Sequence, residues 1–93
     1  MEIEFDPEKR EKVLRERGLD LADAAALLLG ECATEVDDRF DYGEQRWISY
    51  GLLRGEVVAC VWVDRGEGGV RIVTMRKASR YEQERYFRYV AGF

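Results

Sequence analysis

The amino-acid sequence predicts an α+β fold with two N-terminal helices, a four-stranded antiparallel sheet and a C-terminal helix. Helical spacing and capping residues mark the chain up to Gly30, and short apolar runs separated by polar or glycine-bearing turns follow from Cys32. A second capping pattern then precedes the C-terminal segment. With 93 residues, 46% of them apolar, the length suits one compact domain over residues 1–93.

The two N-terminal helices are predicted from their end signals. Asp6 can accept from the free amides of a first helix, and Pro7 at the first helical position loses no needed hydrogen bond, while Gly18 ends the helix. A second helix is predicted from about Asp20 to Gly30, which we expect to be a left-handed cap. On this second helix we expect the side chains at helical spacing to face the core, namely Leu21, Ala24, Ala25 and Leu28.

The sheet is predicted from four short runs joined by tight turns. Arg54 and Gly55 have the composition of a hairpin turn. The run 57–63 is apolar on both faces, so we expect it in the middle of the sheet. The four predicted strands cover residues 32–36, 47–53, 57–63 and 70–75. Residues 3–5 are expected to add a short strand before the first helix.

The last helix is predicted to begin after Ser79. Ser79 and Glu82 have the spacing of a capping box, and the helix is expected to continue to about Val90. Its expected contacts with the rest of the fold are Tyr86, Tyr89 and Val90.

Composition excludes several classes of protein. No apolar run approaches the roughly 20 residues that cross a membrane, and the acidic N-terminus lacks the pattern of a secretion signal, so a cytoplasmic protein is expected. Cys32 and Cys60 are then expected as reduced thiols. Because the chain has no histidine and no Cys-x-x-Cys motif, we expect neither a metal site nor a cofactor.

The basic charge is concentrated although the net charge is −4. Residues 1–44 carry six Lys/Arg against fourteen Asp/Glu, whereas residues 65–88 carry seven against three. The basic members of the second segment are Arg65, Arg71, Arg76, Lys77, Arg80, Arg85 and Arg88. They are consistent with an anion-binding face or with an ordinary solvated surface laced with ion pairs.

Several segments of the chain form one ordered pattern of motifs. Residues 5–9 read Phe-Asp-Pro-Glu-Lys and residues 18–21 read Gly-Leu-Asp-Leu. Residues 37–46 are an aspartate-rich stretch with Tyr-Gly-Glu and arginine that leads into a strand, and Gly51 follows. The pattern then extends through Arg65, residues 71–78, Glu82 and Tyr86. Together these segments resemble the BrnT toxins of bacterial type II toxin-antitoxin systems, most strongly over residues 37–46.

This resemblance implies a RelE-like fold and a metal-independent ribonuclease that blocks translation. It also implies neutralisation by a co-encoded BrnA-type antitoxin, a ribbon-helix-helix DNA-binding protein, with DNA contacted only through that partner. Three positions depart from the family pattern, because Val13 stands for an asparagine and Glu16-Arg17 for a lysine-histidine pair. The alternative is therefore a catalytically inactive, antitoxin-binding module of the same fold.

RNA cleavage without a metal needs a base for the 2′-OH and cations for the phosphate. Arginine suits the second role because its planar fork matches phosphate oxygens. The candidate catalytic residues are Glu44, Arg46, Arg65, Arg71 and Arg76, and the candidate RNA-binding residues are Arg17, Lys77 and Arg80. Glu44 is the candidate base, with Lys77 as an alternative; an ion pair between Glu44 and Arg46 is the competing interpretation.

Other residues have two interpretations each. Arg65 is expected in the glycine-bearing turn 65–69, either at the phosphate or as a surface residue. Arg71 and Arg76 are five apart, so a regular strand puts them on opposite faces. They can meet at one phosphate only if Arg76 lies past the strand end or a bulge intervenes. Tyr81 and Trp47 are candidates for stacking on bases or for the core. Asp37, Asp38 and Asp41 suggest a solvated acidic turn, a contact for a basic antitoxin segment or, less well, a metal site.

Overall fold

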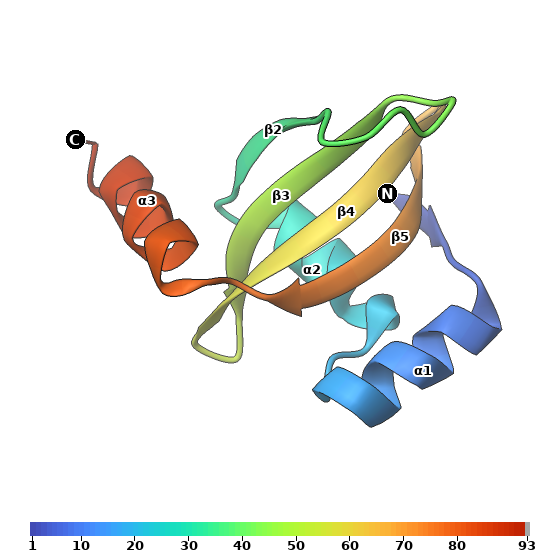
Figure 1. Ribbon diagram of the computed structural model, residues 1–93, viewed down its shortest axis with the longest axis horizontal. Helices are drawn as coiled ribbons and strands as arrows, with labels where there is room; N and C mark the ends of the chain where they lie inside the picture. The colour runs from blue at the N-terminus through green and yellow to red at the C-terminus, as the bar shows by residue number, and fades with distance from the viewer. Residues whose placement is uncertain (93) are drawn as a thin grey trace.

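The computed structural model describes residues 1–92 and shows a five-stranded mixed sheet with helices on both faces (Figure 1). The elements in chain order are β1 (Glu2–Glu4), α1 (Pro7–Arg17), the 3₁₀ turn η1 (Leu21–Asp23), α2 (Ala24–Leu29), β2 (Ala33–Asp37), β3 (Arg46–Leu53), β4 (Glu56–Gly66), β5 (Gly69–Lys77) and α3 (Arg80–Ala91). No helix within residues 1–92 is long and apolar enough to span a bilayer.

The sheet has the order β1-β5-β4-β3-β2, and it corrects the predicted four-stranded antiparallel sheet. Strands β2 to β5 form the predicted antiparallel meander, but β1 pairs in parallel with β5 and makes the sheet mixed. The expected short strand near residues 3–5 is therefore present, shifted to Glu2–Glu4. The prediction that the apolar third strand is central is confirmed, since β4 lies between β3 and β5.

The helix ends follow from local chemistry with two corrections. Asp6 accepts from the Glu8 amide at 2.9 Å, and Gly18 ends α1 in the left-handed conformation at φ +70°. The second helix is instead split into η1 and α2. Gly30 is extended at φ −84° and ψ −168°, so it is no left-handed cap.

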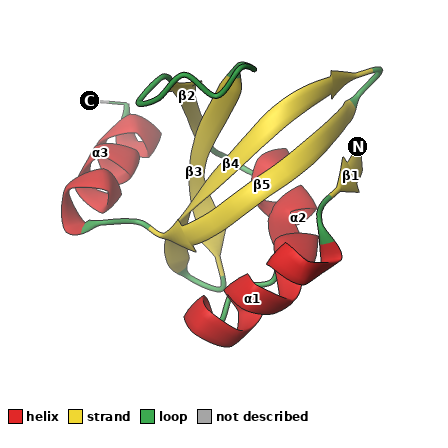
Figure 2. Cartoon of the chain, turned by 45° about the vertical axis from the view of Figure 1, so that its right-hand side comes forward, coloured by secondary structure: helices red, strands yellow, loops and turns green. Residues whose placement is uncertain are grey.

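The two faces of the sheet bury separate cores. The α1/α2 face packs Val13, Leu21 and Leu27 against Val58, Cys60 and other residues of the central strands. The α3 face packs Tyr86 against Ile48, Tyr50 and Ala59. Figure 2 shows α1 and α2 together on one side of the strands and α3 apart from them.

Helix α3 is held less closely than predicted. The capping box of Ser79 and Glu82 is confirmed, and Tyr86 is buried with its hydroxyl donating to the Glu31 carbonyl at 2.9 Å. Tyr89 and Val90 are 57% and 39% exposed, so the expectation that both pack this helix down is wrong. Figure 1 shows α3 beside the C-terminal end of β5, whereas the β2–β3 connection lies at the opposite end of the sheet.

Candidate functional site

Two arginines come together on the α3 face, at the end of the sheet that the helix leaves open. Arg46 begins β3 and pairs with Asp37 of β2, while Arg71 lies in β5 opposite Val63 of β4. Side chains alternate along a strand, and Arg46 therefore shares its face with Ile48, a member of the α3-face core. The two guanidinium groups are brought together from segments 25 residues apart in sequence (71 − 46).

The Glu44 carboxylate lies against both guanidinium groups. Its Oε1 accepts from Arg71 Nη2 at 2.7 Å and lies 3.7 Å from Arg46 Nε. The Arg46 guanidinium also stacks on the Tyr42 ring, 3.9 Å from its centroid. Because one carboxylate faces two guanidinium groups, this group of three ionised side chains keeps one net positive charge.

The same arginines have free donors. The Nε atoms of Arg46 and Arg71 are buried and have no hydrogen-bond partner within residues 1–92. Buried N–H groups are normally paired, and an unpaired one costs about 1–3 kcal/mol. We name Glu44, Arg46 and Arg71 the arginine cluster; its spare positive charge suits an anion with several oxygens, such as a phosphate, whereas the buried Nε atoms are not accessible to it in this arrangement.

Arg76 lies on the same face as the arginine cluster because β5 contains a bulge. Val61 pairs with Thr74 and Trp62 with Ile72, so Val73 is an extra residue on β5. The bulge reverses the alternation, which puts Arg76 opposite Ala59 on the α3 face. Of the two ways in which Arg71 and Arg76 could share a face, the structure shows the bulge.

A carboxylate clamps Arg76 in place. Glu82 accepts from Arg76 Nη1 at 2.7 Å and from Nη2 at 2.9 Å, and it also accepts from the Ser79 amide and the Tyr50 hydroxyl. The hydrogen bonds from Arg76 lower the pKa of Glu82 to about 2. Burial, together with the bond to Glu82, raises the pKa of Tyr50 to about 12.

A second clamp lies in the β2–β3 connection, and the sequence interpretation missed it. The Asp37 side chain is 2% exposed and accepts from Arg39 Nε at 2.7 Å and Nη2 at 3.0 Å. The bonds from Arg39 lower the pKa of this carboxyl group. Asp37 is therefore no part of a solvated acidic turn, whereas Asp38 and Asp41 are exposed. The signal available in the sequence was an aspartate directly after a predicted strand and two residues before an arginine.

The other predicted site residues contact partners outside the arginine cluster. Arg65 lies in β4, ahead of the turn at Glu67 and Gly68, and pairs with Glu4 of β1 at 3.2 Å. Its predicted place inside the glycine-bearing turn is therefore corrected. The other three bind neighbours elsewhere: Lys77 with Glu56 at 3.4 Å, Arg80 with Glu84 at 3.5 Å, and Arg17 with the Met75 carbonyl at 2.7 Å.

The two aromatic candidates differ in exposure. Trp47 stacks on Trp62 at a centroid distance of 6.0 Å, and Trp62 packs against the core of the α1/α2 face, away from the arginine cluster. Tyr81 is 66% exposed at the start of α3 and lines a groove with Arg76 and Arg39. That groove has a volume of about 310 Å³. Of these two candidates, Tyr81 is the accessible one, and it lies beside Arg76.

The three departures from the family pattern lie on α1. Val13 is buried in the core of the α1/α2 face, and Glu16 is exposed. Arg17 binds the edge of β5 through Met75. Since α1 covers the face opposite to the arginine cluster, none of these substitutions touches Glu44, Arg46 or Arg71. Within residues 1–92 no three Cys, Asp or Glu side chains are grouped as metal ligands.

Comparisons of the sequence and of the structure with known proteins identify the same family. Residues 5–82 match the family model for the ribonuclease toxin BrnT of type II toxin-antitoxin systems. The structure is similar to the 1.1 Å crystal structure of the Brucella abortus ribonuclease toxin BrnT, with a TM-score of 0.62 and 25% sequence identity. That similarity covers 86% of this chain and 99% of the Brucella chain. No curated protein sequence matches the chain.

Proposed function

Since the chain belongs to the BrnT family of ribonuclease toxins of type II toxin-antitoxin systems, we propose that it is an endoribonuclease that cuts RNA without a metal ion and thereby inhibits translation. One observation carries the proposal. Arg46 and Arg71 converge on a single carboxylate oxygen of Glu44, so an anionic oxygen already lies where a scissile phosphate would bind. Arginine pairs of this kind stabilise the charge that develops on a phosphoryl group.

The reaction uses the chemistry of these three side chains. A phosphate that binds Arg46 and Arg71 competes with Glu44 for the same donors and releases its carboxylate. Glu44 then takes the proton from the 2′-OH, the 2′-oxygen attacks phosphorus, and the bond to the 5′-oxygen breaks. The leaving oxygen takes a proton from solvent. The products are a 2′,3′-cyclic phosphate and a 5′-hydroxyl.

Arg76 is proposed to bind a neighbouring phosphate, because the β5 bulge turns it to the same face and Glu82 fixes its guanidinium. The candidates Arg17, Arg65, Lys77 and Arg80 take no step in this proposal, since each is engaged elsewhere. As for every toxin of this class, the partner is an antitoxin. We propose a BrnA-like, ribbon-helix-helix protein that carries the DNA contacts, and a cytoplasmic site of action.

RNA cleavage by purified variants tests the proposal. Arg46→Ala and Arg71→Ala should each lower the cleavage rate about 100-fold, the cost of removing one transition-state donor. Arg15→Ala is the matched control, because Arg15 is 66% exposed on α1 and meets only Glu11 at 3.9 Å. Thermal melting checks that every variant is folded. The rate of the wild type should be unchanged by a metal chelator.

Two outcomes would count against the enzyme. A double variant, Arg46→Ala/Arg71→Ala, that cleaves RNA as fast as Arg15→Ala would remove the arginine cluster from the mechanism. Products with a 3′-hydroxyl and a 5′-phosphate would exclude attack by the 2′-OH. A wild type that neither slows growth on induction nor cuts RNA would favour the catalytically inactive, antitoxin-binding module.

A further inference from the structure

The two edges of the sheet are treated differently. Strand β1 covers only Gly69–Arg71 of β5, so within residues 1–92 the second half of β5 pairs with β4 on its inner side and has no strand on its outer side. There Arg17 Nη1 donates to the Met75 carbonyl at 2.7 Å and to Thr74 Oγ1 at 3.1 Å. A long, charged side chain across an edge blocks the addition of another strand. This edge is therefore closed.

The opposite edge, β2, is open. It pairs only with β3, and no hydrogen bond from any other part of residues 1–92 reaches its outer backbone. Three successive residues of β2, Thr34 to Val36, are exposed, and Val36 keeps 44% of its surface in contact with solvent. Unpaired backbone groups in a row are a template for an added strand.

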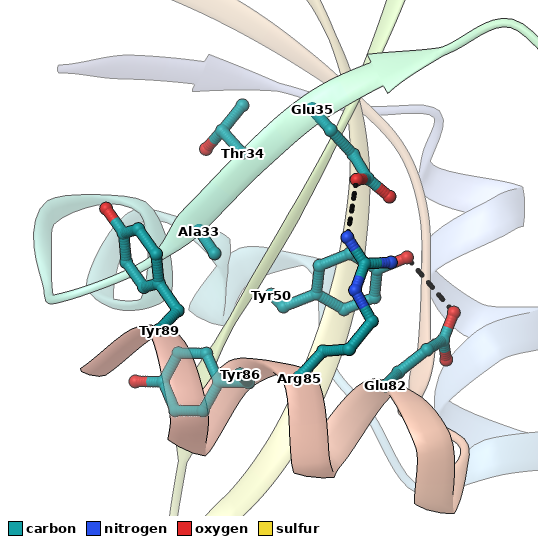
Figure 3. A pocket seen from close by; sticks show the side chains of 8 residues that line it. All are labelled: Ala33, Thr34, Glu35, Tyr50, Glu82, Arg85, Tyr86 and Tyr89. Carbon is teal, nitrogen blue, oxygen red and sulfur yellow. Dashed lines mark hydrogen bonds and ion pairs between the residues drawn. The ribbon is translucent and has the colours of Figure 1, made fainter. Parts of the chain in front are cut away.

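A cavity lies beside this edge, between β2 and α3 (Figure 3). It has a volume of about 240 Å³ and is lined by Ala33, Thr34, Glu35, Tyr50, Glu82, Arg85, Tyr86 and Tyr89. In the close view Glu35 extends from β2 toward Arg85 of α3, which runs below, and the rings of Tyr50, Tyr86 and Tyr89 lie between the strand and the helix. In a strand added to β2, alternate side chains would point to this face.

The charge of the edge selects the partner. Residues 31–38 carry neither lysine nor arginine and four carboxylates: Glu31, Glu35, Asp37 and Asp38. Asp37 is paired with Arg39 and Glu35 with Arg85, whereas Glu31 and Asp38 have no ion pair within residues 1–92. The edge therefore keeps a negative charge that disfavours RNA. A second copy paired antiparallel about Glu35 would set Glu35 against Glu35, and like charges directly opposite destabilise a pair of strands. An extended segment rich in lysine and arginine fits both the backbone and the charge.

We infer that the antitoxin binds along β2 as a sixth strand, through a basic extended segment that places one long side chain in the cavity between β2 and α3. The inference rests on the proposed function, which supplies the antitoxin as partner. The cavity shares Glu35, Tyr50, Glu82 and Arg85 with the groove that contains Arg76. A segment bound at β2 with a side chain in this cavity therefore adjoins the groove where Arg76 is proposed to bind a phosphate, and it would hinder RNA from binding there.

Hydrogen-deuterium exchange on the full toxin, alone and with the antitoxin encoded beside it, tests the added strand. Amides of residues 33–37 should be slowed most in the complex. Glu35→Lys should weaken antitoxin binding at least about tenfold by charge repulsion. Glu2→Lys is the matched control, because Glu2 is exposed on β1, which lies at the opposite edge of the sheet from β2. Glu35→Gln should fall between the two.

The pair of Glu35 with Arg85 is half-exposed, so both Glu35 variants should fold. A complex with protection elsewhere and none at β2 would overturn the inference, as would equal affinities of Glu35→Lys and Glu2→Lys. Failure of the wild type to bind the antitoxin would also overturn it. Ribonuclease activity of the free toxin is assayed separately, so loss of the enzyme proposal is distinguishable from loss of this interface.

Discussion

Glu82→Gln tests how α3 holds Arg76 in the site. The glutamate binds Arg76 with two hydrogen bonds, caps the first turn of α3 through the Ser79 amide and accepts from Tyr50. Glutamine keeps the shape of the side chain but removes its charge and replaces one acceptor oxygen with an NH2 donor. The variant therefore tests the charged, hydrogen-bonded contact between the helix and β5 as a whole.

The pKa of Glu82 gives the size of the effect. A fall from the ordinary value of 4.5 to about 2 corresponds to about 3 kcal/mol of stability at neutral pH. The Glu82 side chain is 16% exposed and Arg76 is 32% exposed, so screening by solvent reduces our expectation to about 2 kcal/mol. For a domain of this length that loss lowers the melting temperature by about 10 °C.

The pH dependence has a definite sign. Because folding lowers the pKa of Glu82, its contribution is complete above about pH 5 and declines as the pH falls from 4.5 towards 2. Urea denaturation of wild type and Glu82→Gln at pH 7 and pH 3 measures this. The difference in unfolding free energy should shrink by more than half at pH 3. A difference below about 0.5 kcal/mol at pH 7, or one that is equal at both pH values, would contradict the stabilising pair of Glu82 with Arg76 and the lowered pKa of Glu82.

Three further predictions concern the fold. Gly51→Ala should lower the free energy of unfolding by about 1–3 kcal/mol, because the new Cβ would lie 3.0 Å from Leu27 Cγ. Urea denaturation measures this, and an unchanged midpoint would show that Leu27 moves aside freely. Asp37→Ala removes the buried partner of Arg39 and should lower the free energy of unfolding by about 2 kcal/mol at pH 7. This difference from the wild type should be smaller at pH 2, and equal differences at both pH values would contradict the lowered pKa of Asp37. Burial raises the pKa of Cys60 to about 12, so a thiol reagent at pH 8 should label Cys32 alone in the native protein and both cysteines in urea. Two reactive thiols in the native state would contradict that burial.

Local chemistry explains which parts of the fold were predictable. The capping box of Ser79 and Glu82, the glycine that ends α1 and the Arg54-Gly55 turn depend on neighbours in sequence, and all three are confirmed. The parallel pairing of β1 with β5 joins residues more than sixty positions apart and involves a three-residue strand, too short for a period. That pairing could not be read from local pattern.

The site was predictable in its residue types but not in its geometry. Arginines on the last strand and Glu44 were identified as candidates from their charge and position. Strand alternation alone separates Arg71 from Arg76, and only the bulge at Val73 puts them on one face. The contact of Glu44 with Arg71 depends on how the β2–β3 connection folds over the sheet, a property of packing that spacing does not encode.

The most direct test of the central proposal is a crystal structure with an RNA whose 2′-OH at the cut site is replaced by hydrogen, which prevents cleavage. We expect a phosphate oxygen within hydrogen-bond distance of both Arg46 and Arg71, with the Glu44 carboxylate displaced toward the 2′ position of the sugar. A phosphate held instead by Arg65 or Arg80, with Glu44 still bonded to Arg71, would contradict it.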